Sequence, residues 1–289
     1  MTNKYQQNQL KLLTGIPRSG TTLCCRLLNS VNNVIALHEP IDPQQLSNNE
    51  TIDVVSEITT SLFDLLSRIE KGLPIPHGNA ENLILDNPIA ESTTANHSQV
   101  RELKAVRGYL SLEKPNSDFM LVVKQNAMFT ALARQLTTSF PLIAIVRNPV
   151  PVLASWMTVD LPVNRGRIPA GEKFDPKLGK LIEQEPSIIS RQLLIYNWFC
   201  KKFVDAGIPI LRYEDIINSG GKALYEKFNI TDSPSIALST PKRTLPEAII
   251  QCLENVAANW EASDSSGLYS ATEVNEALTD VRQYSNDAD

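Results

Sequence analysis

An eight-residue segment near the start of the chain combines glycine, arginine and hydroxyl side chains in a pattern that binds phosphate. It reads Gly15-Ile16-Pro17-Arg18-Ser19-Gly20-Thr21-Thr22. Gly20 lets the backbone turn close to an anion, and the N–H groups of Gly20 to Thr22 are expected to open a helix and point at a phosphate. The two threonine hydroxyls add donors, and the planar guanidinium of Arg18 holds two oxygens. The segment therefore predicts a phosphate-binding loop between a first strand and a first helix.

The loop has the glycine spacing of a Walker A motif but lacks its lysine. Thr21 stands where that lysine is expected, and the positive charge lies at Arg18 instead. A nucleotide triphosphatase uses the lysine on the β- and γ-phosphates, beside Mg²⁺. Asp42, after the second expected strand, is weak evidence for a Walker B metal ligand. The loop therefore favours a nucleotide with no γ-phosphate and no metal.

A second candidate anion site follows a later apolar run. Arg147 ends that run and directly precedes a helix pattern. Asn148, Val152 and Ser155 fall on one face of the expected helix, so Ser155 points the same way as the strand end. A lone strand-end arginine equally often makes a surface ion pair. Together with the first loop, however, Arg147 and Ser155 favour a ligand with two separate phosphates.

Strands alternate with helices along the chain, and this order predicts an α/β fold. Apolar runs predict strands at 10–14, 34–37, 119–123, 141–146 and 208–212, and helical spacing predicts helices at 21–30, 51–70, 98–112, 127–136, 149–157 and 187–206. Strands that are apolar throughout belong to a central parallel sheet flanked by helices on both faces. Ligands bind such sheets beyond the carboxyl ends of the strands, where the chain has Gly15 to Thr22, His38, Glu39, Lys124, Arg147 and Tyr213 to Asp215.

Composition bounds the class of protein. A length of 289 residues suits a single domain over 1–289, with a core at about 10–260 and a C-terminal helix or tail at 261–289. The net charge of −5 disfavours a broad basic face for nucleic acid. No apolar leader or membrane-spanning stretch is evident, so we expect a cytoplasmic protein with no membrane partner. The four cysteines lack metal-ligand spacing, and we expect buried thiols and no metal.

Three motifs together resemble sulfotransferases that use 3′-phosphoadenylyl sulfate (PAPS). The run from Pro17 to Thr22 resembles their 5′-phosphosulfate loop, and Arg147 with Ser155 resembles their 3′-phosphate site. The run Arg212-Tyr213-Glu214-Asp215-Ile216 resembles the segment whose tyrosine meets the adenine. Arginine in the loop is similar to the protein-tyrosine and bacterial branches. The resemblance implies a P-loop kinase-like layout, PAPS as co-substrate and adenosine 3′,5′-bisphosphate as product.

The sequence departs from the family pattern at two places. Leu23 stands where cytosolic members have tryptophan, and the family's late Arg-Lys-Gly segment is not intact. Lys242 and Arg243 are the nearest candidates for that segment. The nucleotide-binding residues that the resemblance implies are Arg18, Ser19, Gly20, Thr21, Thr22, Arg147, Ser155, Tyr213, Lys242 and Arg243.

The implied chemistry is an in-line transfer of a sulfuryl group. An acceptor hydroxyl or amine attacks sulfur, a base takes its proton, and cations steady the charge on the leaving phosphate. Arg18 and Lys124 are the expected cations. Glu39 is the expected base because it lies 21 residues after Arg18, the offset that the tyrosine-sulfating branch implies, and His38 is the alternative. Only one of these neighbours is expected to face the site, and a carboxylate base needs a raised pKa, which a closed apolar pocket supplies.

Two long irregular stretches, 72–88 and 160–186, are expected to hold the acceptor or form a lid. Arg165, Arg167, Lys173 and Lys177 make the second stretch basic, which suits an anionic acceptor or a solvated lid alike. We expect a small hydroxylated metabolite as acceptor. A P-loop nucleotide kinase and a nucleotide-binding regulatory protein without catalysis stay open as alternatives, and the sequence does not indicate an oligomeric state.

Overall fold

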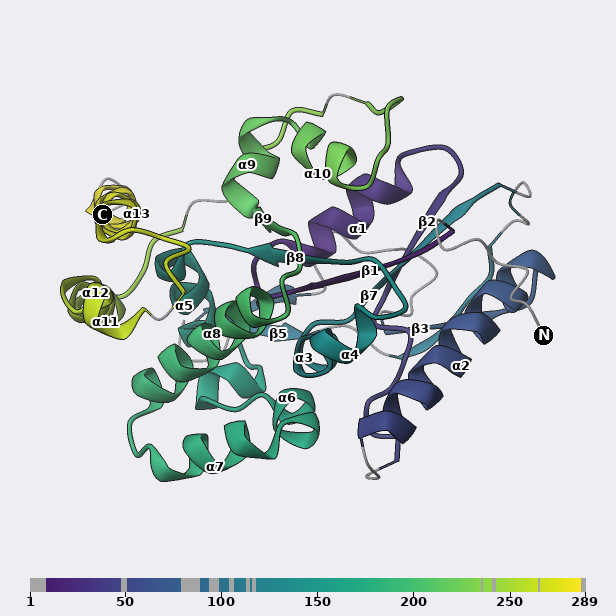
Figure 1. Cartoon of the computed structure of the whole chain (residues 1–289). Helices are drawn as coiled ribbons and strands as arrows, with labels where there is room; N and C mark the ends of the chain where they lie inside the picture. The colour runs from purple at the N-terminus through teal and green to yellow at the C-terminus, as the bar shows by residue number, and fades with distance from the viewer. Residues whose placement is uncertain are drawn as a thin grey trace.

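The centre of the fold is a five-stranded parallel sheet with helices on both faces (Figure 1). The computed structural model describes residues 9–47, 51–78, 89–93, 99–103, 107–112, 115, 118–234, 236–240, 243–264 and 266–286. The strand order is β2-β7-β1-β8-β9, with β1 (Leu10–Gly15), β2 (Val34–His38), β7 (Met120–Lys124), β8 (Leu142–Val146) and β9 (Ile210–Arg212). This order confirms the predicted α/β fold and its P-loop kinase-like layout.

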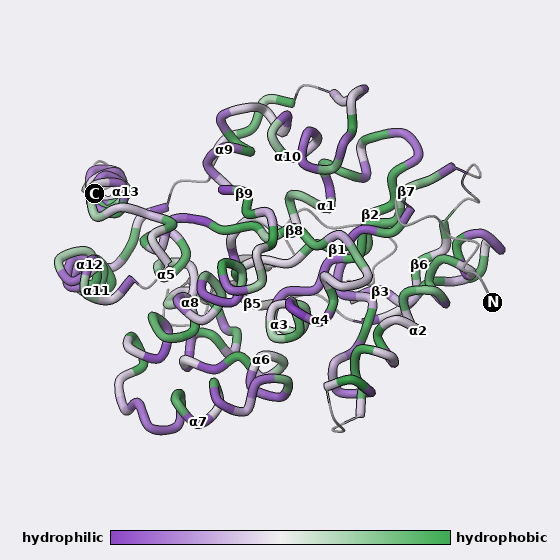
Figure 2. The backbone as a smooth tube through the Cα atoms, viewed as in Figure 1, coloured by the Kyte–Doolittle hydropathy of each residue, from purple (hydrophilic) through white to green (hydrophobic). Residues whose placement is uncertain are grey.

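Alternation along β1 divides the core into two layers. Leu12 packs with one group of buried side chains and Leu13 with another, because successive strand residues point to opposite faces. The Leu13 layer includes side chains of α1 (Thr21–Asn29), α9 (Tyr213–Asn218) and α10 (Lys222–Lys227). The Leu12 layer includes side chains of α3 (Ala127–Ala131), α4 (Ala133–Leu136), α5 (Pro149–Met157) and α8 (Ile188–Asp205). Figure 2 shows hydrophobic residues along the central strands and hydrophilic ones on outer turns such as those of α7.

The remaining elements surround this layered centre. The helices are α2 (Thr51–Glu70), the 3₁₀ helix η1 (Pro162–Arg165), α6 (Pro169–Phe174), α7 (Pro176–Gln184), α11 (Glu247–Ala258), α12 (Trp260–Ser263) and α13 (Ala271–Asn286). Two antiparallel pairs lie outside the main sheet: β3 (Ile75–His77) with β6 (Gly108–Leu110), and β4 (Ile89–Thr93) with β5 (Gln99–Leu103). No helix within the described ranges is long and apolar enough to span a bilayer.

Three sequence expectations about secondary structure are wrong. The segment 98–112 holds β5 and β6 where a helix was expected, because pairing with β4 and β3 overrides local helical spacing. The stretch 160–186 is largely helical, since Pro162, Pro169 and Pro176 each begin a helix, where the missing N–H does no harm. The helix expected at 127–136 is two short helices separated by Leu132. Of the stretch 72–88, residues 79–88 lie outside the described residues.

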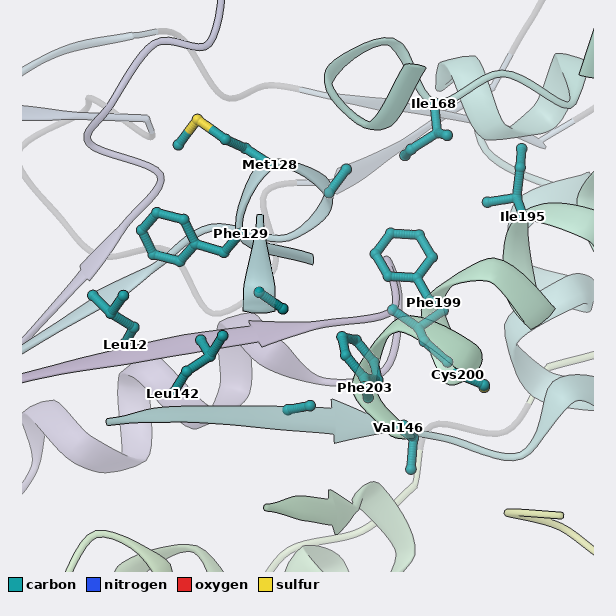
Figure 3. Close-up of a cluster of buried hydrophobic side chains, with 14 of the residues drawn as sticks. Leu12, Met128, Phe129, Leu142, Val146, Ile168, Ile195, Phe199, Cys200 and Phe203 are labelled. Atoms are coloured by element: carbon teal, nitrogen blue, oxygen red, sulfur yellow. The ribbon is translucent and has the colours of Figure 1, made fainter. Parts of the chain in front are cut away.

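The core between α8 and the sheet generates the first prediction. Phe203 is fully buried and belongs to the core cluster that also contains Val146 and Leu142 (Figure 3). Phe203→Ala is expected to lower the free energy of unfolding by about 3–5 kcal/mol, because the lost ring leaves a cavity under the sheet. The adjacent Val204 is 48% exposed, so Val204→Ala is expected to cost about 0.5 kcal/mol or less. Urea unfolding measures both, and equal losses would contradict this packing.

Candidate functional site

A cleft of about 1240 Å³ lies at the carboxyl ends of the sheet strands. Most of the residues that the sequence singled out line it together: Arg18, Gly20, Thr21, Thr22, His38, Glu39, Lys124, Arg147, Ser155, Tyr213 and Arg243. Lys242 lies outside the described residues. Within the described ranges no group of three His, Cys, Asp or Glu side chains is arranged to hold a metal ion. The parallel topology thus gathers residues as far apart in sequence as Arg18 and Arg243.

The candidate phosphate-binding loop is fixed to strand β8 by hydrogen bonds. The Ile16 N–H and the Ser19 hydroxyl both donate to the Ile145 carbonyl, each at 3.1 Å. The Trp156 indole N–H donates to the Pro17 carbonyl at 2.8 Å, which also ties the loop to α5. Ser19 is fully buried and its hydroxyl anchors the loop, so its side chain does not face the cleft as expected. Its neighbours Arg18, Thr21 and Thr22 line the cleft instead.

Glycine at position 20 is required by the ring that packs on the loop. Gly20 is the N-cap of α1 with a φ of 88°, in the left-handed region that other residues avoid. A Cβ built there would lie 2.4 Å from Cδ2 of Tyr213. The Tyr213 ring also contacts Arg147, whose guanidinium carbon lies 4.2 Å from the ring centroid. Tyr213 therefore connects the loop to the second anion site.

The second candidate anion site contains Arg18, Ser155 and Arg147, and Arg243 lies near enough to act on the charge of Arg147. The Arg18 Nε donates to Ser155 Oγ at 3.0 Å, and an Arg147 Nη1 donates to the Arg18 carbonyl at 3.4 Å. Arg147 Nε is buried and has no partner among the described residues. Burial lowers the pKa of Arg147, nearby Arg243 lowers it further, and Tyr213 opposes them. Cations that share a half-buried site in this way are stabilised by a bound anion.

Arg18 joins the loop to the helix α5. Its φ is 73°, and its Nε donates to Ser155 Oγ at 3.0 Å. Arg18 therefore connects the candidate phosphate-binding loop to the second candidate anion site.

A buried lysine and a glutamate meet at the end of strands β2 and β7. Lys124 Nζ lies 2.7 Å from Glu39 Oε1 and 3.2 Å from His38 Nε2. The strand register pairs His38 with Lys124, and the Glu39 N–H donates to the Lys124 carbonyl at 2.8 Å. The Lys124 side chain is only 2% exposed. Since an ammonium group only donates hydrogen bonds, both Glu39 and His38 act as its acceptors.

Both neighbours face the cleft, contrary to the expectation that only one would. Glu39 has a φ of 49°, so it leaves the strand conformation at the point where alternation would have turned it away. A non-glycine residue in this region costs about 1–3 kcal/mol, and such strain gathers at functional sites. The strained backbone therefore places His38 and Glu39 on the same side.

The pKa values of this cluster differ from the expectation of a raised carboxylate pKa. Burial raises the pKa of Glu39, but Lys124, His38 and Arg107 together outweigh it and hold the pKa at about 2. Burial and the Lys124 charge lower the pKa of His38 to about 3. Glu39 is thus a paired carboxylate in the free protein, and His38 is a neutral acceptor that helps to hold Lys124.

Several contacts in and around the cleft were not expected from the sequence. The carboxylate of Glu214 accepts from the Asn148 N–H at 3.0 Å and from the Tyr269 hydroxyl at 2.8 Å. Glu273 lies in the first turn of α13, and its carbonyl accepts from the Asn148 side chain at 3.0 Å. Arg107 donates to the Glu39 carbonyl at 3.2 Å. These contacts depend on pairs far apart in sequence, and only the position of Asn148 before Pro149, which marks a helix N-cap, offered a local signal.

Comparison with known proteins gives one named similarity. No protein-family model matches this sequence, and no curated protein sequence matches it. Among the solved structures that match is the sulfotransferase domain from the curacin biosynthetic pathway, with 15% sequence identity, a TM-score of 0.40 and 96% of each chain covered. An identity and a TM-score this low do not transfer an activity to the chain.

The contact between Gly20 and Tyr213 predicts a specific loss of stability. Left-handed backbone strain alone costs an alanine about 1–2 kcal/mol. Gly20→Ala is expected to lower the free energy of unfolding by more than this, because its methyl group collides with the Tyr213 ring. Gly267 has a φ of 66° and open space around it, so Gly267→Ala isolates the strain alone. In urea unfolding, adding Tyr213→Ala to Gly20→Ala is expected to remove the extra cost. Equal losses for the two single alanine variants would contradict the collision.

The low pKa of His38 predicts how its ring titrates. The chain has 3 histidines, and NMR spectra of His38→Gln identify the His38 signal. That signal is expected to stay in the neutral form from about pH 8 to about pH 5. In the unfolded chain this histidine binds a proton near pH 6.5, whereas in the folded protein it stays neutral at that pH. Protonation therefore favours the unfolded state, and the contribution of His38 lowers the free energy of unfolding as pH falls below about 6.5. A midpoint near 6.5 for this signal would show that the ring is not held neutral.

Proposed function

We propose that the chain transfers a sulfuryl group from PAPS to an acceptor hydroxyl. The observation that carries the proposal is one cleft that combines a loop at the N-terminus of α1, the side chains of Arg147, Ser155 and Arg243, and a lysine–glutamate pair. A donor with two separately held phosphate groups matches the two anion sites. The motif resemblance of the loop, of Arg147 with Ser155 and of Tyr213 supports the same donor. PAPS-dependent transfer is therefore the function that these residues favour.

We assign the donor contacts from the side chains that line the cleft. The N–H groups and hydroxyls of Thr21 and Thr22, at the start of α1, would hold the 5′-phosphosulfate. Arg147, Ser155 and Arg243 would hold the 3′-phosphate, with Arg18 between the two sites. This assignment uses the cationic surroundings of Ser155 and needs no metal.

The proposed reaction is a displacement at sulfur. The acceptor oxygen forms a bond to sulfur while the bond from sulfur to the phosphate oxygen breaks. Glu39 takes the acceptor proton, and the electron pair of the broken bond leaves on adenosine 3′,5′-bisphosphate. Lys124 would steady the developing negative charge on the leaving phosphate.

The ion pair between Lys124 and Glu39 gives this reaction an order. A carboxylate whose pKa is about 2 is a poor base near neutral pH. Anionic donor oxygens would attract Lys124 away from Glu39, and loss of that neighbouring cation raises the pKa of the carboxylate. The donor would therefore bind first and release the base for the acceptor.

Ligand-dependent stability tests the donor. Adenosine 3′,5′-bisphosphate is expected to raise the melting temperature in the presence of EDTA, because it binds the folded state alone. Stabilisation by ATP or GTP only when Mg²⁺ is present would contradict the proposal and favour a P-loop kinase. Stabilisation by the bisphosphate with no transfer to any acceptor would favour a regulatory protein.

A substitution at the base tests the chemistry. Glu39→Gln is expected to lower the transfer of labelled sulfate from PAPS by about 10²–10⁴-fold, the usual contribution of a general base. The stabilisation by adenosine 3′,5′-bisphosphate is expected to persist, because the anion sites are intact. Glu261→Gln, on exposed α12, is the matched control and is expected to keep wild-type transfer. Full transfer by Glu39→Gln would exclude this residue as the base.

A further inference from the structure

The lining of the cleft includes an apolar group of residues that we name the acceptor arm. Its lining includes Pro43, Met128, Leu161, Val163, Ile168 and Ala170. These residues come from the segment after β2, the start of α3, and the segment from η1 to α6. Met128 and Ile168 both belong to the Leu12 layer of the core and lie on the same side of the strands, well apart from each other, in Figure 3. The arm is therefore formed by three segments that are far apart in sequence.

The acceptor arm is held against the reaction centre by hydrogen bonds. The Gln125 side chain, next to Lys124, donates to the Ile41 carbonyl at 2.6 Å. Lys173 of α6 donates to the carbonyls of Pro43 and Leu46 at 2.9 and 2.8 Å. These contacts tie the segment after Glu39 to β7 and to α6. The arm is thus a fixed wall beside the proposed base.

The basic residues of this region do not offer charge to the cleft. Arg165 pairs with Asp160 at 2.9 Å, and Arg167 pairs with Glu172. Lys173 is used on the two carbonyls, and Lys177 is exposed on α7. None of these four cations is among the described residues that line the cleft. The anionic acceptor that their sequence positions suggested has no cation from this stretch to bind.

Glu39 is the single charged residue among the described cleft-lining residues of the segments 39–47, 127–131 and 161–170. A carboxylate or phosphate entering the arm would lose water without gaining a cation. It would also approach the negative charge of Glu39, which raises its energy further. An apolar body gains free energy from the same walls. The arm therefore discriminates against anions and favours uncharged apolar compounds.

We infer that the acceptor is an uncharged alcohol whose hydroxyl is attached to an apolar body that fills the acceptor arm. This inference rests on the proposed function, since it concerns the acceptor of the same transfer. The hydroxyl lies at Glu39, and the apolar body lies against Met128, Leu161 and Ile168. Burial of each methylene group is expected to raise kcat/KM about threefold to fourfold until the arm is filled.

Matched acceptors test the inference. Butanol, hexanol and octanol are compared with the ω-hydroxy acids of the same chain lengths, with PAPS as donor and labelled sulfate ester as the measured product. We expect kcat/KM to rise with alkyl length, and each hydroxy acid to react at least about 100-fold less efficiently than its alcohol. A hydroxy acid that reacts as well as its alcohol would overturn the inference and leave the transfer reaction intact.

A charge placed in the arm provides the second measurement. Ala170→Lys introduces a cation beside the arm and is expected to narrow the gap between each alcohol and its hydroxy acid at least about tenfold. Ala258→Lys, exposed on α11 and outside the cleft lining, is the control and is expected to leave the gap unchanged. If Ala170→Lys leaves the ratio of kcat/KM between each alcohol and its hydroxy acid unchanged, Ala170 does not contact the acceptor, and the proposed role of the acceptor arm is contradicted.

The donor assay separates the two possible failures. If no alcohol reacts while adenosine 3′,5′-bisphosphate still stabilises the protein without Mg²⁺, the acceptor inference is overturned and the donor assignment stands. If the bisphosphate gives no stabilisation and no acceptor reacts, the proposed function fails, and the acceptor inference fails with it.

Discussion

The parallel pairing of β1 with β8 is the constraint on which the cleft depends. It places Gly15 opposite Ile145, and the Ile145 carbonyl then accepts from both the Ile16 N–H and the Ser19 hydroxyl. A Cβ at Gly15 would lie 2.6 Å from that carbonyl, so the close approach requires glycine. Because β8 continues into Arg147, the same pairing brings the loop to the second anion site. One strand contact therefore sets the distance between the two places where anions would bind.

The cleft gathers positively charged side chains although the chain as a whole is negatively charged. The protein has a net charge of −5, yet Arg18, Arg147 and Arg243 line one cleft and a buried lysine ends β7. Lys124 is held in the free protein by Glu39 and neutral His38, so the buried ammonium keeps acceptors before any ligand arrives. Under the proposed function, this ion pair would keep the carboxylate of Glu39 paired until the donor binds, which gives a physical reason for a donor-first order.

The sequence predicted the parts of this fold that depend on residues close together in the chain. Apolar runs identified the sheet strands, and glycine and hydroxyl spacing identified the loop, since both signals lie within a few residues. The strands β5 and β6 were not predicted, because the local spacing of apolar residues is helical and the strands form only by pairing with β4 and β3. The prolines of 160–186 read as irregular chain although three of them begin helices. The low pKa of Glu39 depends on Lys124, 85 positions away, and Lys242 lies outside the described residues.

The central claim is that the cleft holds two separate phosphate groups of one nucleotide, and calorimetric titration tests it most directly. Adenosine 3′,5′-bisphosphate and adenosine 5′-monophosphate are titrated in EDTA into the wild-type protein and into Arg147→Met. The account predicts that the wild type binds the bisphosphate about 10–100-fold more tightly, as charge-assisted contacts to one further phosphate imply. Arg147→Met should lose most of that preference while its affinity for the monophosphate changes little. Equal affinities of the wild type for the two nucleotides would contradict the account.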